Sequence, residues 1–206
     1  MSGTPHPSTG GEAASLPRRL SDAANVLVLD APRSASGSGL WTDDTGIGPC
    51  TDGAVLFVAF TRSDAAVLSE RVRDSNRAVY VLDATPQGTI AEQTGPDPTV
   101  TVETVSSPSN LTDVGVALDK LCSALESSGG RPVCWLPSLT ALLQYVDRQR
   151  TYRFLNAMSN RLTAVDAFAH YHLDEGAHDD RTVDTFASLM DAVVIPTDDS
   201  VRVRRR

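Results

Sequence analysis

The chain has 206 residues, a length typical of one domain, and a formal net charge of −8 from 26 acidic and 18 basic residues. An acidic surface with a single lysine, Lys120, keeps a protein soluble where salt screens charge, which indicates a salt-adapted host. The charge disfavours nucleic acid as a partner, because binding to phosphates requires a cationic face. No apolar run reaches the roughly 18 residues of a membrane span, so we expect a cytoplasmic protein that does not bind a membrane.

The two ends of the chain differ in composition from the rest. Residues 1–20 are rich in Ser, Gly, Pro and Thr, and we predict a disordered leader there. Residues 21–200 form the predicted domain. The run V-R-V-R-R-R at residues 201–206 is interpreted as a solvated basic tail. The alternatives are a contact with nucleic acid or an acidic partner, and a last edge strand. The three cysteines form no C-x-x-C pair and are interpreted as small buried hydrophobes.

From Asn25 onward, short β-branched apolar runs alternate with amphipathic segments. This alternation predicts an α/β fold with a mostly parallel sheet. Each predicted strand is bounded by turn residues. The predicted strands are 25–30, 54–60, 78–82, 100–105, 132–136, 167–173 and 192–195.

Apolar residues that recur at intervals of three and four predict the helices between these strands. Two stripes are long and regular, and the first ends before Gly129, a plausible helix stop. Two further helices are predicted from capping residues followed by shorter stripes. The predicted helices cover 111–125, 152–165, 183–193 after the cap Thr182, and a segment with Val67, Leu68 and Val72 after the cap Ser63.

The segment after the first predicted strand, A-P-R-S-A-S-G-S-G-L-W at residues 31–41, has the place of a phosphate loop. In the pattern G-x-x-x-x-G-K-[ST], backbone N–H groups wrap the phosphates, the lysine reaches the outer phosphates and the hydroxyl holds Mg²⁺. On that pattern Ser34 and Gly39 take the two glycine positions. The pattern therefore predicts a decayed loop without tight triphosphate binding, and a flexible linker is the alternative. The residues of this decayed loop are Ser34, Gly37, Gly39, Leu40 in place of the lysine and Trp41 in place of the hydroxyl residue.

Three further runs carry a family resemblance. They are P-V-C-W-L-P-S-L-T-A-L-L-Q-Y, R-T-Y-R-F-L-N-A-M-S-N-R-L and H-Y-H-L-D-E-G-A-H-D-D-R-T-V, which begin at residues 132, 150 and 170. Together they resemble RecA/KaiC-like proteins of salt-loving archaea. The resemblance implies a RecA-like three-layer α/β/α fold with a mostly parallel central sheet over about residues 25–195.

The resemblance also indicates what the position of Pro137 corresponds to in the family. In nucleotide-binding relatives the strand before S-L-T-A-L-L ends in an aspartate that orients Mg²⁺ and the attacking water, and Pro137 stands in that place here. Proline offers neither a carboxylate nor an N–H group. Asp83, at the end of another predicted strand, is interpreted as a turn former. We therefore expect both phosphate-handling motifs to be lost.

Three of the 4 histidines, His170, His172 and His178, fall within one short segment. In a strand, the period of two places His170 and His172 on one face, and Asp174 follows just past its end. With His178, these side chains could form a site for zinc or another transition metal. The alternative is that the histidines make hydrogen bonds within the fold.

The residues after His178 suit the start of a helix, because the carboxylates of Asp179 and Asp180 meet the positive end of the helix dipole. A hydrolase would need Ser138 or Ser36 as nucleophile and His172 or His178 as base, but no G-x-S-x-G motif supports it.

These observations predict a non-catalytic RecA/KaiC-like regulatory or protein-interaction domain, a pseudo-ATPase that has lost ATP binding and hydrolysis and uses no cofactor. We expect it to act through a protein partner or through self-association. One alternative is a metal-binding enzyme or sensor that uses His170, His172, Asp174 and His178. Another is a weak, Mg²⁺-independent nucleotide sensor that uses backbone amides of residues 36–39.

Overall fold

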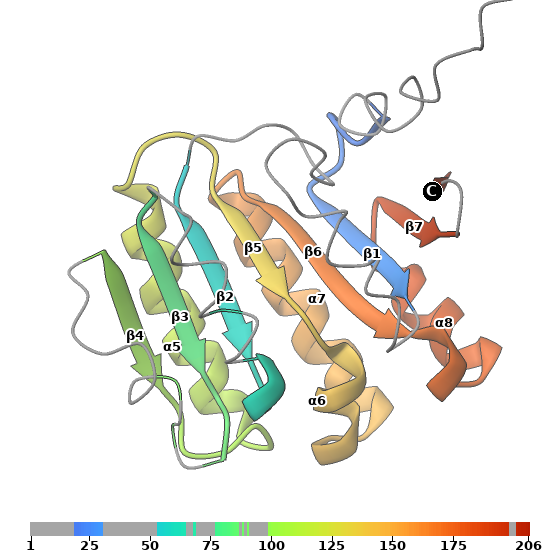
Figure 1. Cartoon of the computed structure of the whole chain (residues 1–206), viewed down its shortest axis with the longest axis horizontal. Coiled ribbons are helices and arrows are strands. Elements are labelled where there is room, and N and C mark those ends of the chain that lie inside the picture. Colours follow the sequence, from blue (N-terminus) through green and yellow to red (C-terminus); the bar gives the residue numbers. More distant parts are fainter. Residues whose placement is uncertain are drawn as a thin grey trace, which may run out of the picture.

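The computed structural model describes residues 19–30, 53–64, 68, 77–86, 88, 90, 99–197 and 201–206. From Val100 to Pro196, strands alternate with one or two helices (Figure 1). The strands are β1 (Asn25–Asp30), β2 (Val55–Ala59), β3 (Val79–Asp83), β4 (Val100–Thr104), β5 (Val133–Leu136), β6 (Phe168–Asp174), β7 (Ala192–Pro196) and β8 (Val201–Arg205). The helices are α5 (Leu111–Glu126), α6 (Leu139–Tyr145), α7 (Arg148–Ala164), the 3₁₀ turn η2 (Glu175–Ala177) and α8 (Asp180–Ala187).

The eight strands form one sheet in the order β4-β3-β2-β5-β6-β1-β7-β8. Every neighbouring pair is parallel except β7 and β8, which are antiparallel. The seven predicted strands are all present with bounds within one or two residues of the prediction. The α/β class with a mostly parallel central sheet is therefore confirmed.

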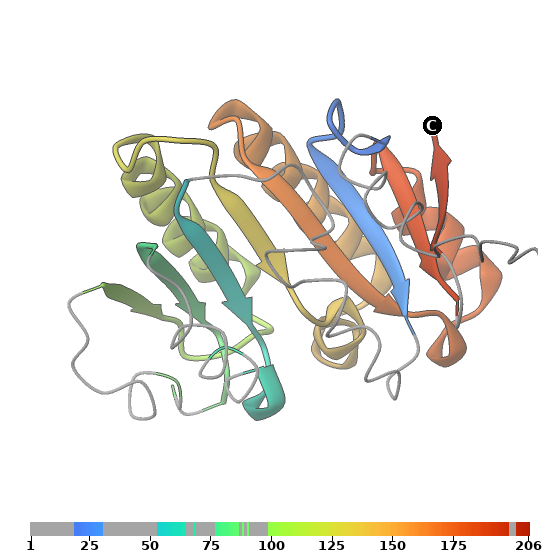
Figure 2. The same cartoon turned by 45° about the horizontal axis from the view of Figure 1, so that its top comes forward.

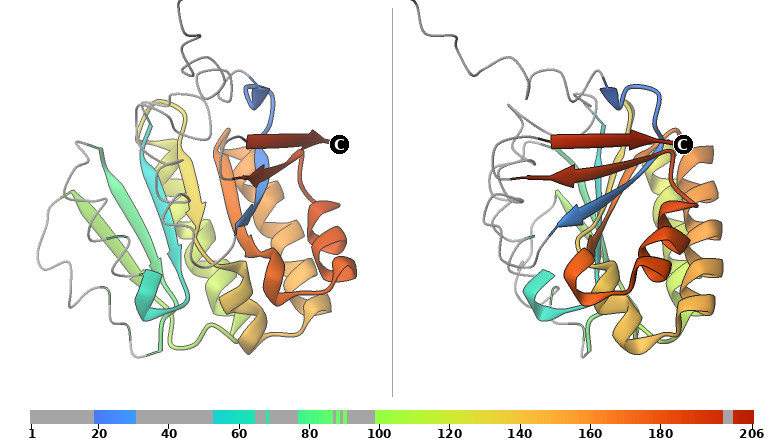
Figure 3. Two further views of the ribbon diagram at one scale, coloured as in Figure 1. Left: turned by 45° about the vertical axis from the view of Figure 1, so that its right-hand side comes forward. Right: turned by 90° about the vertical axis from the view of Figure 1, so that its right-hand side faces the viewer.

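Helices α5, α6, α7 and α8 pack on one face of this sheet, as the right-hand view of Figure 3 shows. The period of two along each strand divides the side chains between the faces. In β6, Ala169, Tyr171 and Leu173 join the large core under the helices, whereas Phe168 joins a separate cluster on the other face. A third cluster on that other face surrounds Phe57.

Capping explains where the helices begin. Asn110, Ser138, Asp147 and Asp179 each accept a hydrogen bond from a backbone N–H in the first turn of α5, α6, α7 and α8, respectively. Each such contact satisfies a donor that has no partner within the helix. None of the helices in the described ranges is long and apolar enough to cross a membrane.

Two helix predictions need correction, and one observed helix was not predicted. Asp179, not Thr182, caps α8, and this helix ends at Ala187 rather than continuing to 193. Arg62 is already helical, so Ser63 is not a cap, and the rest of that predicted helix lies mainly outside the described residues. Helix α6 was not predicted, because its seven residues are too few to display a repeating stripe.

Both predicted tails contain residues that belong to the domain. Leu20 is fully buried and packs with Ala23 and Val26, so the predicted leader ends before it, and residues 1–18 lie outside the described ranges. Residues Val201–Arg205 form β8 and complete the sheet (Figure 2). The basic run therefore forms an edge strand rather than a solvated tail.

Candidate functional site

The carboxyl ends of the parallel strands meet at one edge of the sheet, and Pro137, Asp174 and His178 lie there, after β5 and at and after the end of β6. β6 lies between β1 and β5, and the register places Asp30 opposite Asp174 at the ends of β1 and β6. Ligands of open α/β sheets bind outside this edge. We therefore call the carboxyl ends of β5 and β6, together with the turns that follow them, the carboxyl edge.

At the end of β5, the chain enters α6 without presenting a carboxylate. Pro137 follows Leu136 directly and is half-buried. The next side chain, Ser138, caps α6 by accepting a hydrogen bond from the Ala141 N–H at 3.0 Å. The hydroxyl of Ser138 thus serves the helix backbone.

At the end of β6, one threonine ties two turns together. The Oγ1 atom of Thr140 accepts a hydrogen bond from the Asp174 N–H and lies 3.0 Å from Nε2 of His178. The Asp174 carboxylate accepts the Gly176 N–H at 3.0 Å. His178 is therefore paired with Thr140 and not with Ser138, so the pair of Ser138 with His178 is not formed, while Ser36 lies outside the described residues.

His170 and His172 lie side by side on the face of β6 opposite the helices, as the strand period predicts. His170 Nδ1 is 3.2 Å from His172 Nε2, and both residues are buried. Their neighbours on this face are aromatic: the ring centres of Trp135 and His170 are 5.8 Å apart, and Trp135 meets Phe57 edge to face. Burial and the neighbouring His172 lower the pKa of His170 well below its ordinary value, so this imidazole is neutral.

The four metal candidates separate into two places. His170 and His172 lie within the strand on the face opposite the helices, whereas Asp174 and His178 bond to the Thr140 hydroxyl and neighbouring turns. Among the described residues, no group of three or more His, Cys, Asp or Glu side chains is arranged to hold a metal ion. Zinc sites usually use four ligands, or three with a water, so the expected arrangement is not formed by these residues.

The remaining reactive side chains also serve the fold. The Asp83 carboxylate is fully buried and accepts hydrogen bonds from the Thr85 N–H, the Thr85 hydroxyl and the Ile90 N–H, as expected of a turn former. Burial raises the pKa of the Cys122 thiol to about 11 and that of Cys134 well above its ordinary value. Both thiols stay protonated, and a protonated thiol is a poor nucleophile.

The decayed phosphate loop lies outside the described residues. Ser34, Gly37, Gly39, Leu40 and Trp41 all fall in this part of the chain. The same is true of Ser36 and Cys50. The interpretation of this loop therefore remains a prediction from the sequence.

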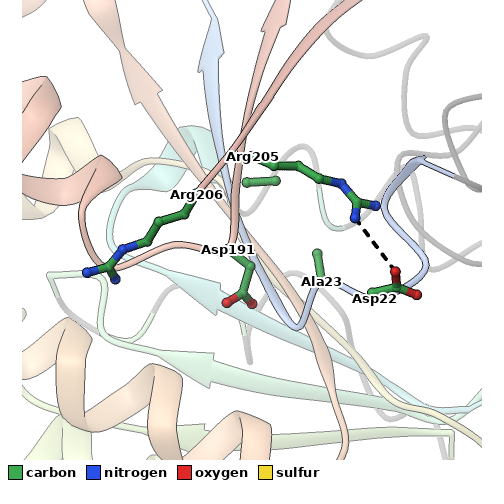
Figure 4. A pocket seen from close by; sticks show the side chains of 6 residues that line it. Asp22, Ala23, Asp191, Arg205 and Arg206 are labelled. Atoms are coloured by element: carbon green, nitrogen blue, oxygen red, sulfur yellow. Dashed lines mark ion pairs between the residues drawn. The ribbon is translucent and has the colours of Figure 1, made fainter.

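A pocket of about 310 Å³ opens at the opposite end of the sheet, where β1 and β7 begin (Figure 4). Its charged groups are occupied within the chain. The Asp191 carboxylate accepts the N–H groups of Ala24 and Asn25, and Arg205 pairs with Asp22 at 3.6 Å. These contacts anchor the start of β1 to β7 and β8, which is a structural role.

Thr140 is the site residue that sequence reasoning missed. A threonine in the first turn of a helix carries no signal of its partners, because these come from β6 and from the turn before α8, more than 30 residues away. The only available signal was its place three residues after Pro137 in the run that carries the family resemblance.

Comparisons with known proteins add a fold and a family. The fold is similar to that of an uncharacterized protein from Pyrococcus horikoshii, solved in complex with an unknown peptide, with a TM-score of 0.57 and 13% identity. That match covers 92% of this chain and 86% of the other. No curated protein matches. A family model described as "Family of unknown function (DUF7504)" matches residues 23–195, so the chain belongs to this family.

Proposed function

We propose that this chain is a non-catalytic regulatory or protein-interaction domain of the RecA/KaiC type that neither binds nor hydrolyses ATP. The observation that carries the proposal is the carboxyl edge, where Pro137 ends β5 and the neighbouring hydroxyl and carboxylate groups accept hydrogen bonds from the chain's own backbone.

The strand order supports the RecA/KaiC type. The phosphate loop would follow β1, and the metal-orienting aspartate would end β5. With β6 alone between them, these two parallel strands end at the same edge, about 10 Å apart. A triphosphate with its Mg²⁺ could be held jointly from two strand ends at that separation. This strand order supports the proposal.

The polar groups oppose phosphoryl transfer. That chemistry depends on positioning and on positive charge near the phosphates, supplied by a lysine and a metal ion. Leu40, Trp41 and Pro137 offer neither an ammonium group nor a metal ligand. Two of the carboxylates that end described strands are used within the fold: Asp83 accepts three hydrogen bonds of its own turn, and Asp174 accepts the Gly176 N–H.

A binding role has independent support. The structural neighbour from Pyrococcus horikoshii was solved with a peptide, so this type of fold can present a surface to a polypeptide. Folds of this kind host many functions, and the function resides in the surface that each member presents. A protein partner therefore fits an α/β domain that has lost its ATP site.

The test is a calorimetric titration of the purified chain with Mg²⁺ and ATP at high salt, with an assay for phosphate release. We expect no saturable heat and no turnover. A matched variant, Leu40→Lys/Trp41→Thr/Pro137→Asp, restores all three missing groups and should gain measurable affinity if the fold is of the RecA/KaiC type. Submicromolar binding or turnover by the unaltered chain would contradict the proposal.

A further inference from the structure

Strand β8 lies at one edge of the sheet. Most of the positive charge of this strand lies on one of its faces. Its sequence, V-R-V-R-R, alternates apolar and basic residues in a chain of net charge −8. Val201 and Val203 are half-buried and pack against the cluster that contains Leu20. Arg202 and Arg204 point to the opposite face and are exposed. β8, the strand at the edge of the sheet (Figure 3), thus has one anchored face and one cationic face.

The ladder with β7 fixes the direction of the backbone groups of β8. The Arg206 N–H donates to the Asp191 carbonyl at 3.1 Å, and this pair continues the register that joins Arg204 to Val193. Alternate pairs in an antiparallel ladder exchange hydrogen bonds, so Arg202, Arg204 and Arg206 turn their backbone groups toward β7. Pro196 lies opposite Val201 in a non-hydrogen-bonded pair. The missing N–H of this proline therefore costs the ladder no hydrogen bond.

The remaining residues of β8 turn their backbone groups away from the sheet. In Val201, Val203 and Arg205 the N–H and carbonyl groups point outward. Among the described residues, only one of these outward groups has a side-chain partner: the Val201 carbonyl accepts a hydrogen bond from the Arg19 guanidinium at 3.4 Å. An edge of this kind is a template for a further strand.

Arg202 and Arg204 differ from Arg205 and Arg206 in their side-chain partners. Arg205 donates to the Arg19 carbonyl and pairs with Asp22, and Arg206 donates to the Ser188 carbonyl. Within the part of the chain that the structure describes, no carboxylate pairs with Arg202 or Arg204. Two exposed guanidinium groups therefore flank the outward-facing backbone of Val203.

We propose that β8 binds an extended acidic segment of a partner protein by strand addition. An antiparallel strand that bonds to Val203 would place its neighbouring residues opposite Arg202 and Arg204 in non-hydrogen-bonded pairs, where side chains lie closest. Carboxylates at alternate positions of that strand would meet the two guanidinium groups. The partner segment is therefore an extended run with Glu or Asp at every second residue.

Two other occupants fit less well. A second β8 would bring arginines opposite arginines, and like charges that face each other across strands are destabilising. Nucleic acid would meet the acidic body of the chain, whose charge opposes phosphate. Both become outcomes of the test below.

The inference rests on the proposed interaction role and gives that role a surface and a partner chemistry. A failure to bind acidic peptide would overturn this inference and leave the absence of ATP chemistry untouched. ATP turnover with peptide binding unchanged would overturn only the non-catalytic part of the proposed function. The two proposals can therefore fail separately.

The first experiment titrates the full chain with a fluorescent peptide of about ten residues that alternates Glu and Thr, at about 0.1 M salt, where charges act over about 10 Å. Control peptides have the same composition with the Glu residues in one block, or N-methyl groups on alternate residues to block strand pairing. We expect binding only to the unmodified alternating peptide. Equal binding of all three peptides, or tighter binding of a DNA or RNA oligonucleotide, would overturn the inference.

The second experiment compares four variants with the unaltered chain. Arg202→Gln/Arg204→Gln should weaken peptide binding about tenfold or more, because it removes both charges. Val203→Pro should abolish binding because it removes an outward N–H, whereas the matched Val203→Ala keeps that N–H and should bind. Arg205→Gln, which alters an arginine already paired within the chain, should change binding by less than about twofold.

Unfolding curves show that each variant is folded, and amide hydrogen exchange provides the structural result. The N–H groups of Val203 and Arg205 should become protected when the peptide binds, while those of the β7 ladder stay unchanged. Binding without this protection, or protection that depends on self-association in the absence of peptide, would contradict strand addition.

Discussion

The carboxyl edge and the margin of β8 use their polar groups in opposite ways. At the carboxyl edge, the side chains of Ser138, Thr140 and Asp174 accept hydrogen bonds from the chain's own backbone. At β8, the backbone groups of Val203 and the side chains of Arg202 and Arg204 point to solvent. The polar groups of the carboxyl edge are thus used within the fold, whereas those of β8 are available to the proposed partner strand.

The largest expected effect is at the end of β3. Asp83→Ala should destabilise the chain by about 3 kcal/mol, because it leaves the buried donors of Thr85 and Ile90 without their acceptor. Chemical denaturation measures this loss, and Asp83→Asn, which keeps one acceptor oxygen, should lose less. A change below about 0.5 kcal/mol for the alanine variant would remove the structural role of Asp83.

A smaller loss is expected at Thr140. Thr140→Val keeps the shape of the side chain and removes both of its hydrogen bonds, so we expect a loss of about 2 kcal/mol. Thr140→Ser retains the hydroxyl and provides the matched control. If Thr140→Val left stability unchanged but altered peptide or nucleotide binding, the carboxyl edge would be a ligand site after all.

The buried imidazole of His170 predicts a dependence of stability on pH. The folded chain holds His170 neutral because its pKa is well below the ordinary value of 6.5, while the unfolded chain takes up a proton near 6.5. Stability should therefore fall as the pH drops below 6.5, by up to about 1.4 kcal/mol per pH unit. Denaturation at several pH values measures the slope, and His170→Phe should reduce it. An equal slope in this variant would contradict the assignment.

The next smaller loss of stability is expected at Ser138, which caps α6. Ser138→Ala should destabilise the chain by about 1 kcal/mol, because the Ala141 N–H loses its acceptor. Ser138→Asp supplies another capping oxygen and should restore most of the loss. Thermal unfolding measures both variants. If Ser138→Asp also conferred Mg²⁺ binding, the start of α6 would be able to form part of a metal site.

The smallest effect on stability is expected at β8. Arg202→Gln and Arg204→Gln should each change the free energy of unfolding by less than about 0.5 kcal/mol, because neither side chain has an ion pair in the described parts of the chain. The same variants should lose the acidic peptide. A large loss of stability would mean that these arginines serve the fold, and the contrast with the carboxyl edge would disappear.

Much of the fold follows from local pattern. The apolar runs of β1 and β7 predicted these strands because both are buried on their two faces, and the stripe of α5 predicted its helix because one side packs on the sheet. Helix α6 was missed because it is too short for a stripe. The cap of α8 was misplaced at Thr182 because several residues near its start can cap a helix.

The candidate site was less predictable, because its contacts join distant segments. The facing of His170 and His172 followed from the strand period, but the bond between Thr140 and His178 depends on how α6 meets the turn before α8. Likewise, the sequence showed that the last run is basic. Which of its arginines pair with the chain depended on the turn around Arg19.

A crystal structure of the chain grown with excess Mg²⁺ and ATP would show whether the carboxyl edge holds a nucleotide. We expect no triphosphate between the carboxyl ends of β1 and β5, with Ser138 and Thr140 in the same hydrogen bonds as described above. An ordered γ-phosphate and Mg²⁺ between those two strand ends would contradict it.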